Sequence, residues 1–81
     1  MWVRPEDQRI VGECLAAARM RAGVTQREVA DRLGKPQSFV SAYETGQRRV
    51  DLLEFIAIAG ALQVDPRAVF REIVRRHTPK P

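Results

Sequence analysis

The chain has 81 residues, of which 44% are hydrophobic and 30% are charged, a length and composition typical of one compact domain. It holds one cysteine, Cys14, and one histidine, His77, which excludes an intrachain disulfide, a zinc cluster and a Cys/His catalytic pair within one copy. No apolar run is long enough to span a membrane, and the first residues lack the order of a secretion signal. We therefore expect a cytoplasmic protein with no cofactor, no metal and no membrane association.

The formal net charge is +4, and it is unevenly distributed. Residues 1–50 hold nine Lys and Arg against six Asp and Glu, whereas residues 51–81 hold five against four. A positive charge favours a polyanionic partner, although on its own it is weak evidence for nucleic acid. Because most of the excess lies in the first fifty residues, a binding face is expected there.

Residues 6–22 are predicted to form the first helix. Pro5, followed by two acidic residues, suits a helix start, and Gly23 suits its end. The apolar residues at helical spacing in between are Val11, Cys14, Leu15 and Ala18. Since Cys14 lies in this stripe, we interpret it as an ordinary core residue.

The second helix is predicted over residues 26–33. Thr25 and Glu28 have the spacing of a capping box, in which each side chain accepts a hydrogen bond from the backbone amide of the other. The helix ends at Gly34, and a tight turn follows. The apolar stripe of this helix is formed by Val29, Ala30 and Leu33.

Residues 37–45 are predicted to form the third helix, with Pro36 at its start. Val40 and Tyr43 fall on one side of it, and Phe39 lies at the edge of that side. The opposite side carries Gln37, Ser38, Ser41 and Ala42. Two short helices joined at a glycine, the second exposing small neutral residues, indicate a helix-turn-helix, although short helix pairs are also common in bundles.

The last two helices are predicted over residues 51–62 and 66–77, each started by a capping aspartate. The first of them has Glu54 as its only strongly polar side chain, so we expect it to be largely enclosed. Its predicted inner face is formed by Leu52, Ile56, Ala59 and Leu62. Residues 1–77 are then a single domain, and residues 78–81 are a flexible tail.

The sequence also matches a known pattern over roughly residues 10–70. The matching positions in the first three helices are Val11, Gly12, Leu15, Arg19, Gly23 to Gln26, Val29, Ala30, Leu33, Gly34, Val40, Ser41, Tyr43, Glu44 and Gly46. Those downstream are Arg48 to Leu52, Ala59 and Leu62 to Val64. With these residues the chain resembles the lambda-repressor/Cro-like (XRE) helix-turn-helix family. The resemblance implies an all-α domain of five helices that inserts its third helix into the major groove of double-stranded operator DNA, as a dimer, to repress or activate transcription.

The resemblance also implies roles for individual residues. Gln37 matches the position from which a glutamine grips adenine, and Gln26 matches a phosphate clamp that braces it. Arg19 and Glu44 match positions that form an ion pair. The predicted base contacts are Gln37, Ser38, Phe39, Ser41 and Ala42. The predicted phosphate contacts are Gln26, Arg27, Lys35, Thr45, Arg48 and Arg49. A solvated helix face is the alternative for these residues, and the rim of the core is the alternative for Phe39.

A homodimer is expected because one recognition helix reads too few base pairs to select an operator within a genome. Adjacent apolar pairs on the last helix make its stripe wider than one short core requires, and apolar residues of the fourth helix extend it. The predicted dimer interface is formed by Phe55, Ile58, Val69, Phe70, Ile73 and Val74. The alternative is that both helices only complete a monomer core.

Two further alternatives concern the function and the N-terminal residues. An antitoxin or adaptor whose main partner is another protein is less favoured, because a toxin-binding extension usually needs chain beyond five helices. An enzyme is excluded by the lack of a nucleophile-base set, a phosphate-binding glycine loop or metal-ligand spacing, and no separate small-molecule ligand domain is expected. Trp2 and Arg4 are either a cap on the core, which we favour, or an arm on DNA.

Overall fold

The computed structural model describes residues 2–77, and over this range the chain is all-α. Its elements are a short 3-10 turn, η1 Pro5–Asp7, and the helices α1 Gln8–Arg21, α2 Gln26–Leu33, α3 Gln37–Glu44, α4 Leu52–Leu62 and α5 Pro66–His77. The predicted fold class is confirmed, and the helix bounds agree closely except that the first predicted helix begins as a 3-10 turn. The tail predicted at 78–81 lies outside the described residues.

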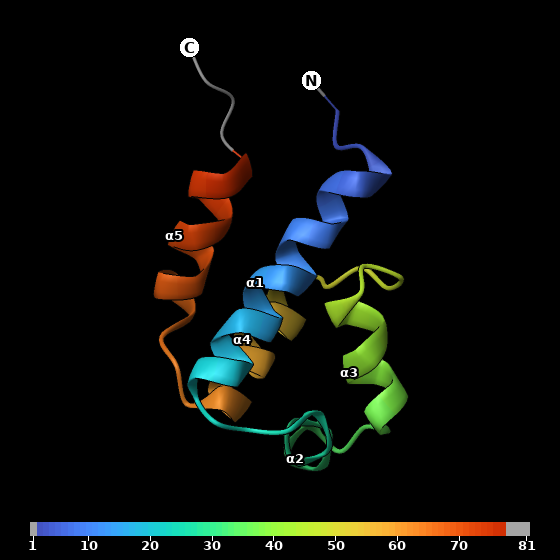
Figure 1. Cartoon of the computed structure of the whole chain (residues 1–81), viewed down its shortest axis with the longest axis vertical. Coiled ribbons are helices and arrows are strands. Elements are labelled where there is room, and N and C mark those ends of the chain that lie inside the picture. Colours follow the sequence, from blue (N-terminus) through green and yellow to red (C-terminus); the bar gives the residue numbers. More distant parts are fainter. Residues whose placement is uncertain (1, 78–81) are drawn as a thin grey trace.

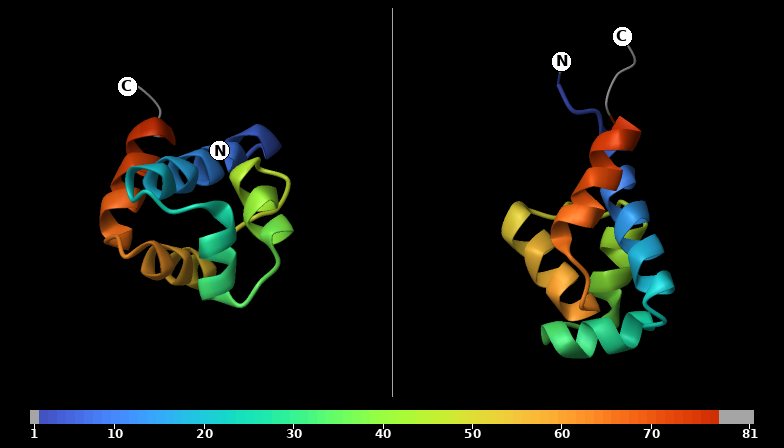
Figure 2. Two further views of the ribbon diagram at one scale, coloured as in Figure 1. Left: turned by 60° about the horizontal axis from the view of Figure 1, so that its bottom comes forward. Right: turned by 90° about the vertical axis from the view of Figure 1, so that its left-hand side faces the viewer.

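α3 and α5 lie on opposite flanks of α1, and α2 lies across one end of the molecule (Figures 1 and 2). The start of α1 and the end of α5 meet at the other end, where Asp7 Oδ2 and His77 Nε2 are 3.4 Å apart. The described part of the chain measures 41 × 23 × 20 Å. α3 is therefore presented on a flank that α5 does not cover.

The core lies where the five helices meet. Its largest fully buried side chains are Leu15, Val29, Val40, Tyr43 and Ile58. Burying an apolar side chain of this size stabilises a fold by roughly 1.5–3 kcal/mol, so these residues dominate the packing. Cys14, at 3% exposure, is the core residue that the sequence predicted.

α1 and α3 approach each other most closely at Gly12. A Cβ atom at this position would lie 2.0 Å from the backbone oxygen of Tyr43, well inside van der Waals contact. Tyr43 is 1% exposed, and its ring meets the Phe39 ring edge-on with a centroid distance of 5.6 Å. Gly12 thus sets the distance between α3 and the rest of the bundle.

The face that α4 buries differs from the prediction. The side chains of α4 that enter the core are Phe55, Ile58, Ala59 and Leu62, whereas Leu52 and Ile56 are 67% and 48% exposed. Because nearly every residue of α4 is apolar, two of its faces satisfy the helical spacing, and the pattern does not select between them. α4 is therefore not enclosed, and Phe55 and Ile58, which were predicted at the dimer interface, are buried in the core.

α5 also contributes less to an outer apolar surface than the sequence predicted. Val69 is 4% exposed and belongs to the core, and Ile73 packs partly against it. Phe70 and Val74 are 53% and 44% exposed. Phe70 shares a shallow apolar cleft with residues of α4 and the start of α5, namely Leu52, Phe55, Ile56, Pro66 and Arg67.

The residues ahead of α1 do not cap the core. Trp2 is 89% exposed, so the favoured expectation for it was wrong. The Arg4 amide donates to Asp7 Oδ2 at 3.0 Å, and the Arg4 side chain forms ion pairs with Glu6 and Asp7 at 3.6 Å. These contacts close η1 on itself.

Candidate nucleic-acid interface

The sequence specifies both ends of α2 and the start of the turn that leads to α3. The Glu28 amide donates to Thr25 Oγ1 at 3.1 Å and the Thr25 amide donates to Glu28 Oε1 at 3.0 Å, which confirms the predicted capping box. Gly34 ends α2 with a φ of 67°, a left-handed value that glycine adopts without strain. The Lys35 amide then donates to the Ala30 carbonyl at 2.9 Å. The two helices are thereby held in one fixed relative orientation.

A chain of polar contacts runs from α1 to the first residue of α3. Arg19 Nε donates to Glu44 Oε2 at 2.6 Å, and Arg19 Nη2 donates to Oε1 at 3.2 Å. Gln26 Nε2 donates to Glu44 Oε1 at 2.9 Å, and Gln37 Nε2 donates to Gln26 Oε1 at 3.3 Å. The Arg19 and Glu44 side chains are only 16% and 7% exposed, whereas Gln37 is exposed. A shielded ion pair thus orients a solvent-facing amide.

The ion pair of Arg19 and Glu44 also affects the charge and the contacts of the groups next to it. Hydrogen bonding to Glu44 raises the pKa of the Arg19 guanidinium, so this group stays positively charged. Arg19 Nη1 donates to the Val24 carbonyl at 2.9 Å, which ties the loop between α1 and α2 to the same group. Burial raises the pKa of Tyr43, beside Glu44, above its usual value, and its phenol stays neutral. The Arg19 guanidinium and the Tyr43 phenol therefore each keep one protonation state over the neutral range.

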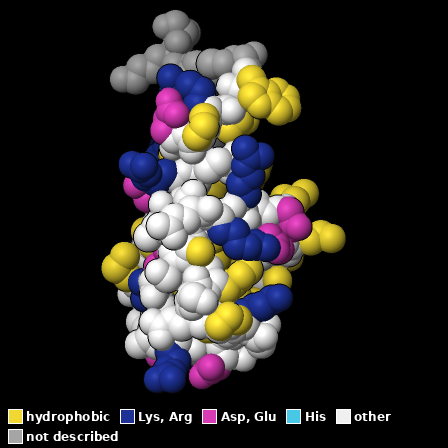
Figure 3. Space-filling model, turned by 90° about the vertical axis from the view of Figure 1, so that its right-hand side faces the viewer, with side chains coloured by type: hydrophobic (Ala, Val, Ile, Leu, Met, Phe, Trp, Pro, Cys, Tyr) yellow, Lys and Arg dark blue, Asp and Glu magenta, His cyan; other side chains and the backbone are white. Residues whose placement is uncertain are grey.

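Four of the predicted base contacts lie along the outer side of α3. Gln37 and Ser38 are exposed in its first turn, and Ser41 and Ala42 are half-buried one turn further on. On this flank neutral polar side chains and backbone occupy much of the middle, and Lys and Arg side chains lie around them, with Asp, Glu and hydrophobic side chains in between (Figure 3). The neutral hydrogen-bonding side chains suit the base edges of a DNA groove, and the Lys and Arg side chains around them suit its phosphates.

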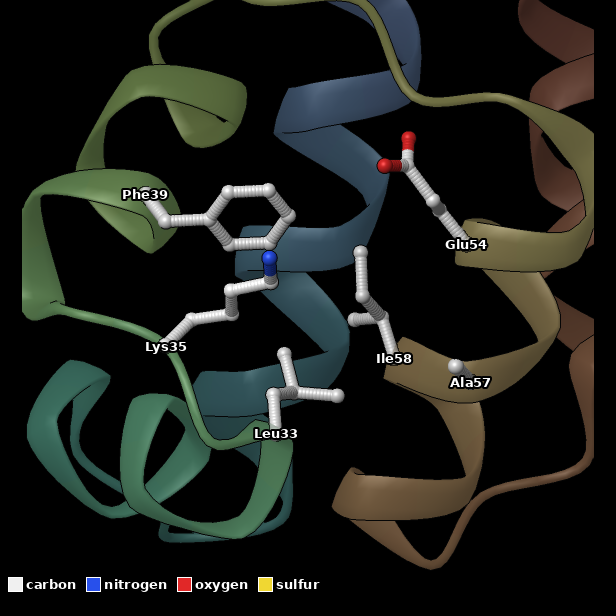
Figure 4. A pocket seen from close by; sticks show the side chains of 6 residues that line it. All are labelled: Leu33, Lys35, Phe39, Glu54, Ala57 and Ile58. Carbon is white, nitrogen blue, oxygen red and sulfur yellow. The ribbon is translucent and has the colours of Figure 1, made fainter.

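Phe39, the fifth predicted base contact, is turned to the rim of the core. Its ring centroid is 4.5 Å from the Arg48 guanidinium and 5.7 Å from the Lys35 ammonium, so two cations flank the aromatic ring. It lines a cavity of about 130 Å³ with Leu33, Lys35, Glu54, Ala57 and Ile58 (Figure 4). Phe39 is engaged in packing between α3 and α4.

The basic residues predicted to contact phosphate fall into two groups. Arg27, Lys35 and Arg49 are exposed and form no ion pair within residues 2–77. Arg48 instead donates from Nη1 and Nη2 to the two carboxylate oxygens of Glu54, at 3.0 and 2.7 Å. Arg48 is thus paired within the protein, whereas the other three remain available to contact phosphate.

Thr45 and Gln26 are the uncharged residues among the predicted phosphate contacts, and they differ in their surroundings. The Thr45 hydroxyl donates to the carbonyl groups of Ser41 and Ala42 at 3.0 and 3.2 Å. Its one proton is used within the last turn of α3 in this structure. Gln26 lies in the first turn of α2, where backbone amides favour an anion.

Several contacts were not predicted from the sequence. Arg32 Nη1 donates to the Ala61 carbonyl at 2.7 Å and ties α2 to α4. Glu54 is the partner of Arg48 and also accepts the Asp51 amide at 3.0 Å, which forms a second capping box at the start of α4. The spacing of Asp51 and Glu54 could have revealed this box, whereas nothing in the pattern signals the ion pair.

This fold and this site define a helix-turn-helix DNA-binding domain. A family model described as helix-turn-helix matches residues 15–69, more than half of the chain. A comparison with curated protein sequences gives no match. In the structure, none of the helices within residues 2–77 is long and apolar enough to cross a lipid bilayer.

Similar solved structures support the same assignment. An XRE-family like protein from Pseudomonas syringae pv. tomato is 39% identical over 91% of this chain and 89% of its own, with a TM-score of 0.78. The restriction-modification controller protein C.AhdI from Aeromonas hydrophila is 34% identical over 80% of this chain and 98% of its own, with a TM-score of 0.72. The clp gene regulator ClgR from C. glutamicum is 23% identical over 91% and 96%, with a TM-score of 0.83, and shows the fold. The chain belongs to the XRE/Cro-like helix-turn-helix family, and it is a DNA-binding protein rather than an enzyme.

Proposed function

We propose that the chain is a transcriptional regulator that binds double-stranded DNA sequence-specifically with α3 in the major groove. The observation that carries this proposal is the polar chain that ends on Gln37. A glutamine can donate to N7 and accept from N6 of adenine in a bidentate contact only when its amide is correctly oriented. Because Gln26 and the buried pair behind it already orient Gln37, less conformational entropy is lost when the base contact forms.

Phosphate contacts in this proposal come from residues that surround α3. Gln26 donates from the start of α2, and Arg27, Lys35 and Arg49 supply charge. Lys35 precedes the N-terminus of α3, where the helix dipole disfavours a cation, and a nearby phosphate relieves that conflict. Such contacts position the domain and make the affinity salt-dependent, while the residues of α3 supply the base preference.

A role in transcription is supported by the similar proteins. C.AhdI, at 34% identity, is named a controller protein of restriction-modification. ClgR, which shares the fold, is named a gene regulator. Regulation of gene expression is therefore the function that we propose for DNA binding by this chain.

The proposed working species is a symmetric dimer on a pseudo-palindromic operator. A two-fold axis repeats one half-site and sets the two recognition helices about 34 Å apart, one turn of DNA. The candidate surface of this dimer is formed by exposed apolar side chains of α4 and α5, of which Phe70 and Val74 belong to the predicted interface. These are Leu52, Ile56, Phe70 and Val74, with exposures of 67%, 48%, 53% and 44%. Covering them with a second copy removes apolar area from water.

Selection of bound duplexes from a random pool tests this function directly. We expect an enriched consensus with two-fold symmetry, with half-site centres about 34 Å apart along the DNA. A folded protein that enriches no sequence would overturn the proposal. If such a protein bound a second protein tightly instead, the antitoxin or adaptor role would take its place.

A further inference from the structure

Glu54 lies in the first turn of α4, near two of the basic residues around α3, Arg48 and Lys35. Its two carboxylate oxygens accept from Nη1 and Nη2 of Arg48, at 3.0 and 2.7 Å, and Oε1 also accepts the Asp51 amide. The Arg48 guanidinium lies over the Phe39 ring at 4.5 Å. The hydrogen bonds from Arg48, with that from Asp51, lower the pKa of Glu54 to about 2. Glu54 is thus a carboxylate at neutral pH and grips the arginine fork with both oxygens.

A second cation, Lys35, lies near the same carboxylate. Lys35 and Glu54 line one cavity from opposite sides, and the Lys35 ammonium points toward the Phe39 ring (Figure 4). The charge of Lys35 also contributes to the low pKa of Glu54. One acidic residue therefore acts on two side chains that the sequence assigned to DNA phosphates. Its bidentate grip on Arg48 has the geometry with which guanidinium groups bind phosphate.

We propose that Glu54 is an internal substitute for a DNA phosphate: it withholds Arg48 from the DNA backbone and thereby limits sequence-independent affinity. This inference rests on the proposed DNA-binding function. The Arg48 and Glu54 side chains are 40% and 31% exposed, and an ion pair at such exposure is weak enough to exchange partners. Backbone contacts carry no sequence information, so Glu54 lowers the affinity for every duplex alike and leaves the base preference unchanged.

The test is Glu54→Gln, assayed by the dissociation constant for random-sequence duplexes over a series of salt concentrations. Glutamine serves as well as glutamate at this position of a capping box, so the start of α4 is preserved while the grip on Arg48 is lost. We expect binding about 3- to 10-fold tighter and a salt slope steeper by roughly 0.9, the value for one additional phosphate contact. The consensus selected from a random pool is expected to stay the same.

The matched control is Glu28→Gln. Glu28 occupies the same capping-box position in α2 and accepts the Thr25 amide, but it forms no ion pair within residues 2–77. This variant removes one negative charge without releasing an arginine, so its salt slope is expected to equal that of the wild type. Equal slopes for Glu54→Gln and Glu28→Gln would overturn the inference.

A second variant keeps the net charge. Arg48→Lys can form only a single-contact ion pair with Glu54, so its cation is held less firmly while Glu54 stays in place. Its salt slope is expected between those of the wild type and Glu54→Gln, and it decides the matter if Glu54→Gln does not fold. A wild-type slope in this variant would then overturn the inference. A wild type that binds no duplex would instead contradict the proposed function itself.

Discussion

Gln37 Nε2 and Gln26 Oε1 lie 3.3 Å apart across the turn between α2 and α3. Gln26 also donates to Glu44 at 2.9 Å, so the first side chain of α3 is linked by two hydrogen bonds to a shielded ion pair. The orientation of Gln37 therefore depends on the packing of three helices and not only on its own rotamer. Substitutions at each step of this chain give distinguishable results.

Gln37→Ala should weaken operator binding by roughly 1–3 kcal/mol and relax the base preference at one position in each half-site. Non-specific binding should barely change, because no phosphate contact is lost. The measurement is selection from a random pool together with dissociation constants for the selected site. Gln8→Ala, at the start of α1, is the control and should behave like the wild type. An unaltered consensus in Gln37→Ala would show that Gln37 reads no base.

Lys35→Ala should weaken binding to all duplexes to a similar extent. Loss of one phosphate contact is expected to flatten the salt dependence by about 0.9 in log-log slope. Arg71→Ala removes one exposed positive charge from α5, on the flank opposite α3, and serves as the control for net charge. Identical salt slopes in the two variants would remove Lys35 from the phosphate contacts.

The sequence predicted most accurately those features that short-range signals specify. The bounds of α2 follow from a capping box at Thr25 and a left-handed glycine at Gly34, both of which act within one turn. The buried face of α4 was not predictable, since an almost wholly apolar helix has no preferred side. There the packing of Phe55 and Ile58 against the other helices decides the orientation.

The functional residues were less predictable from local sequence patterns than the bounds of the helices. Gln37 and the ion pair of Arg19 with Glu44 were assigned through resemblance to a family, because the pair joins residues from two helices that spacing does not connect. The contact of Arg48 with Glu54 depends on the path of the loop that precedes α4, which no periodicity describes. Local patterns thus locate the recognition helix, whereas the ion-pair partners of the basic residues around it can be identified only from the structure.

Arg19→Met should destabilise the fold, because it leaves the Glu44 carboxylate shielded and without its main partner. Removing one member of a largely shielded pair is expected to cost roughly 3 kcal/mol, which for a domain of this size lowers the melting temperature by about 12–24 °C. Arg21→Met, an exposed arginine in the last turn of the same helix, is the control and should melt near the wild-type temperature. An unchanged melting temperature in Arg19→Met would contradict a structural role for the pair.

Stability should depend on pH through Glu54. Its pKa is lowered from an ordinary value of 4.5 to about 2, so folding favours the ionised form. A group with a depressed pKa stabilises the fold fully above its unfolded-state pKa, and this stabilisation is lost as pH falls toward the folded-state value. The wild type should therefore exceed Glu54→Gln in melting temperature at pH 6, and the difference should shrink between about pH 4.5 and 2. Thermal melts of both proteins across this range provide the measurement, and a difference independent of pH would show that the carboxylate charge does not stabilise the fold.

The exposed apolar surface of α4 and α5 predicts how the protein assembles. Phe70 is 53% and Ile56 is 48% exposed, and the two side chains line one apolar cleft. A glutamate at either position meets water in a monomer and costs little there, but in a dimer it would be buried opposite its own symmetry copy, where like charges repel. Phe70→Glu and Ile56→Glu should therefore give folded monomers, whereas Met20→Glu, a change at a 62% exposed residue of α1, should leave assembly unchanged.

DNA binding by the same variants separates a role in assembly from a role in recognition. A monomer keeps α3 and its surround, so Phe70→Glu should bind a single half-site as well as the wild type does. On the full operator it should lose cooperativity, because each mismatch discriminates by only about 1–3 kcal/mol and two linked half-sites are needed to reach high selectivity. Sedimentation velocity gives the oligomeric state, and titration of duplexes with one or two half-sites gives the affinities. A wild type that sediments as a monomer at concentrations that saturate its operator would rule out the dimer, since every half-site would then be occupied independently.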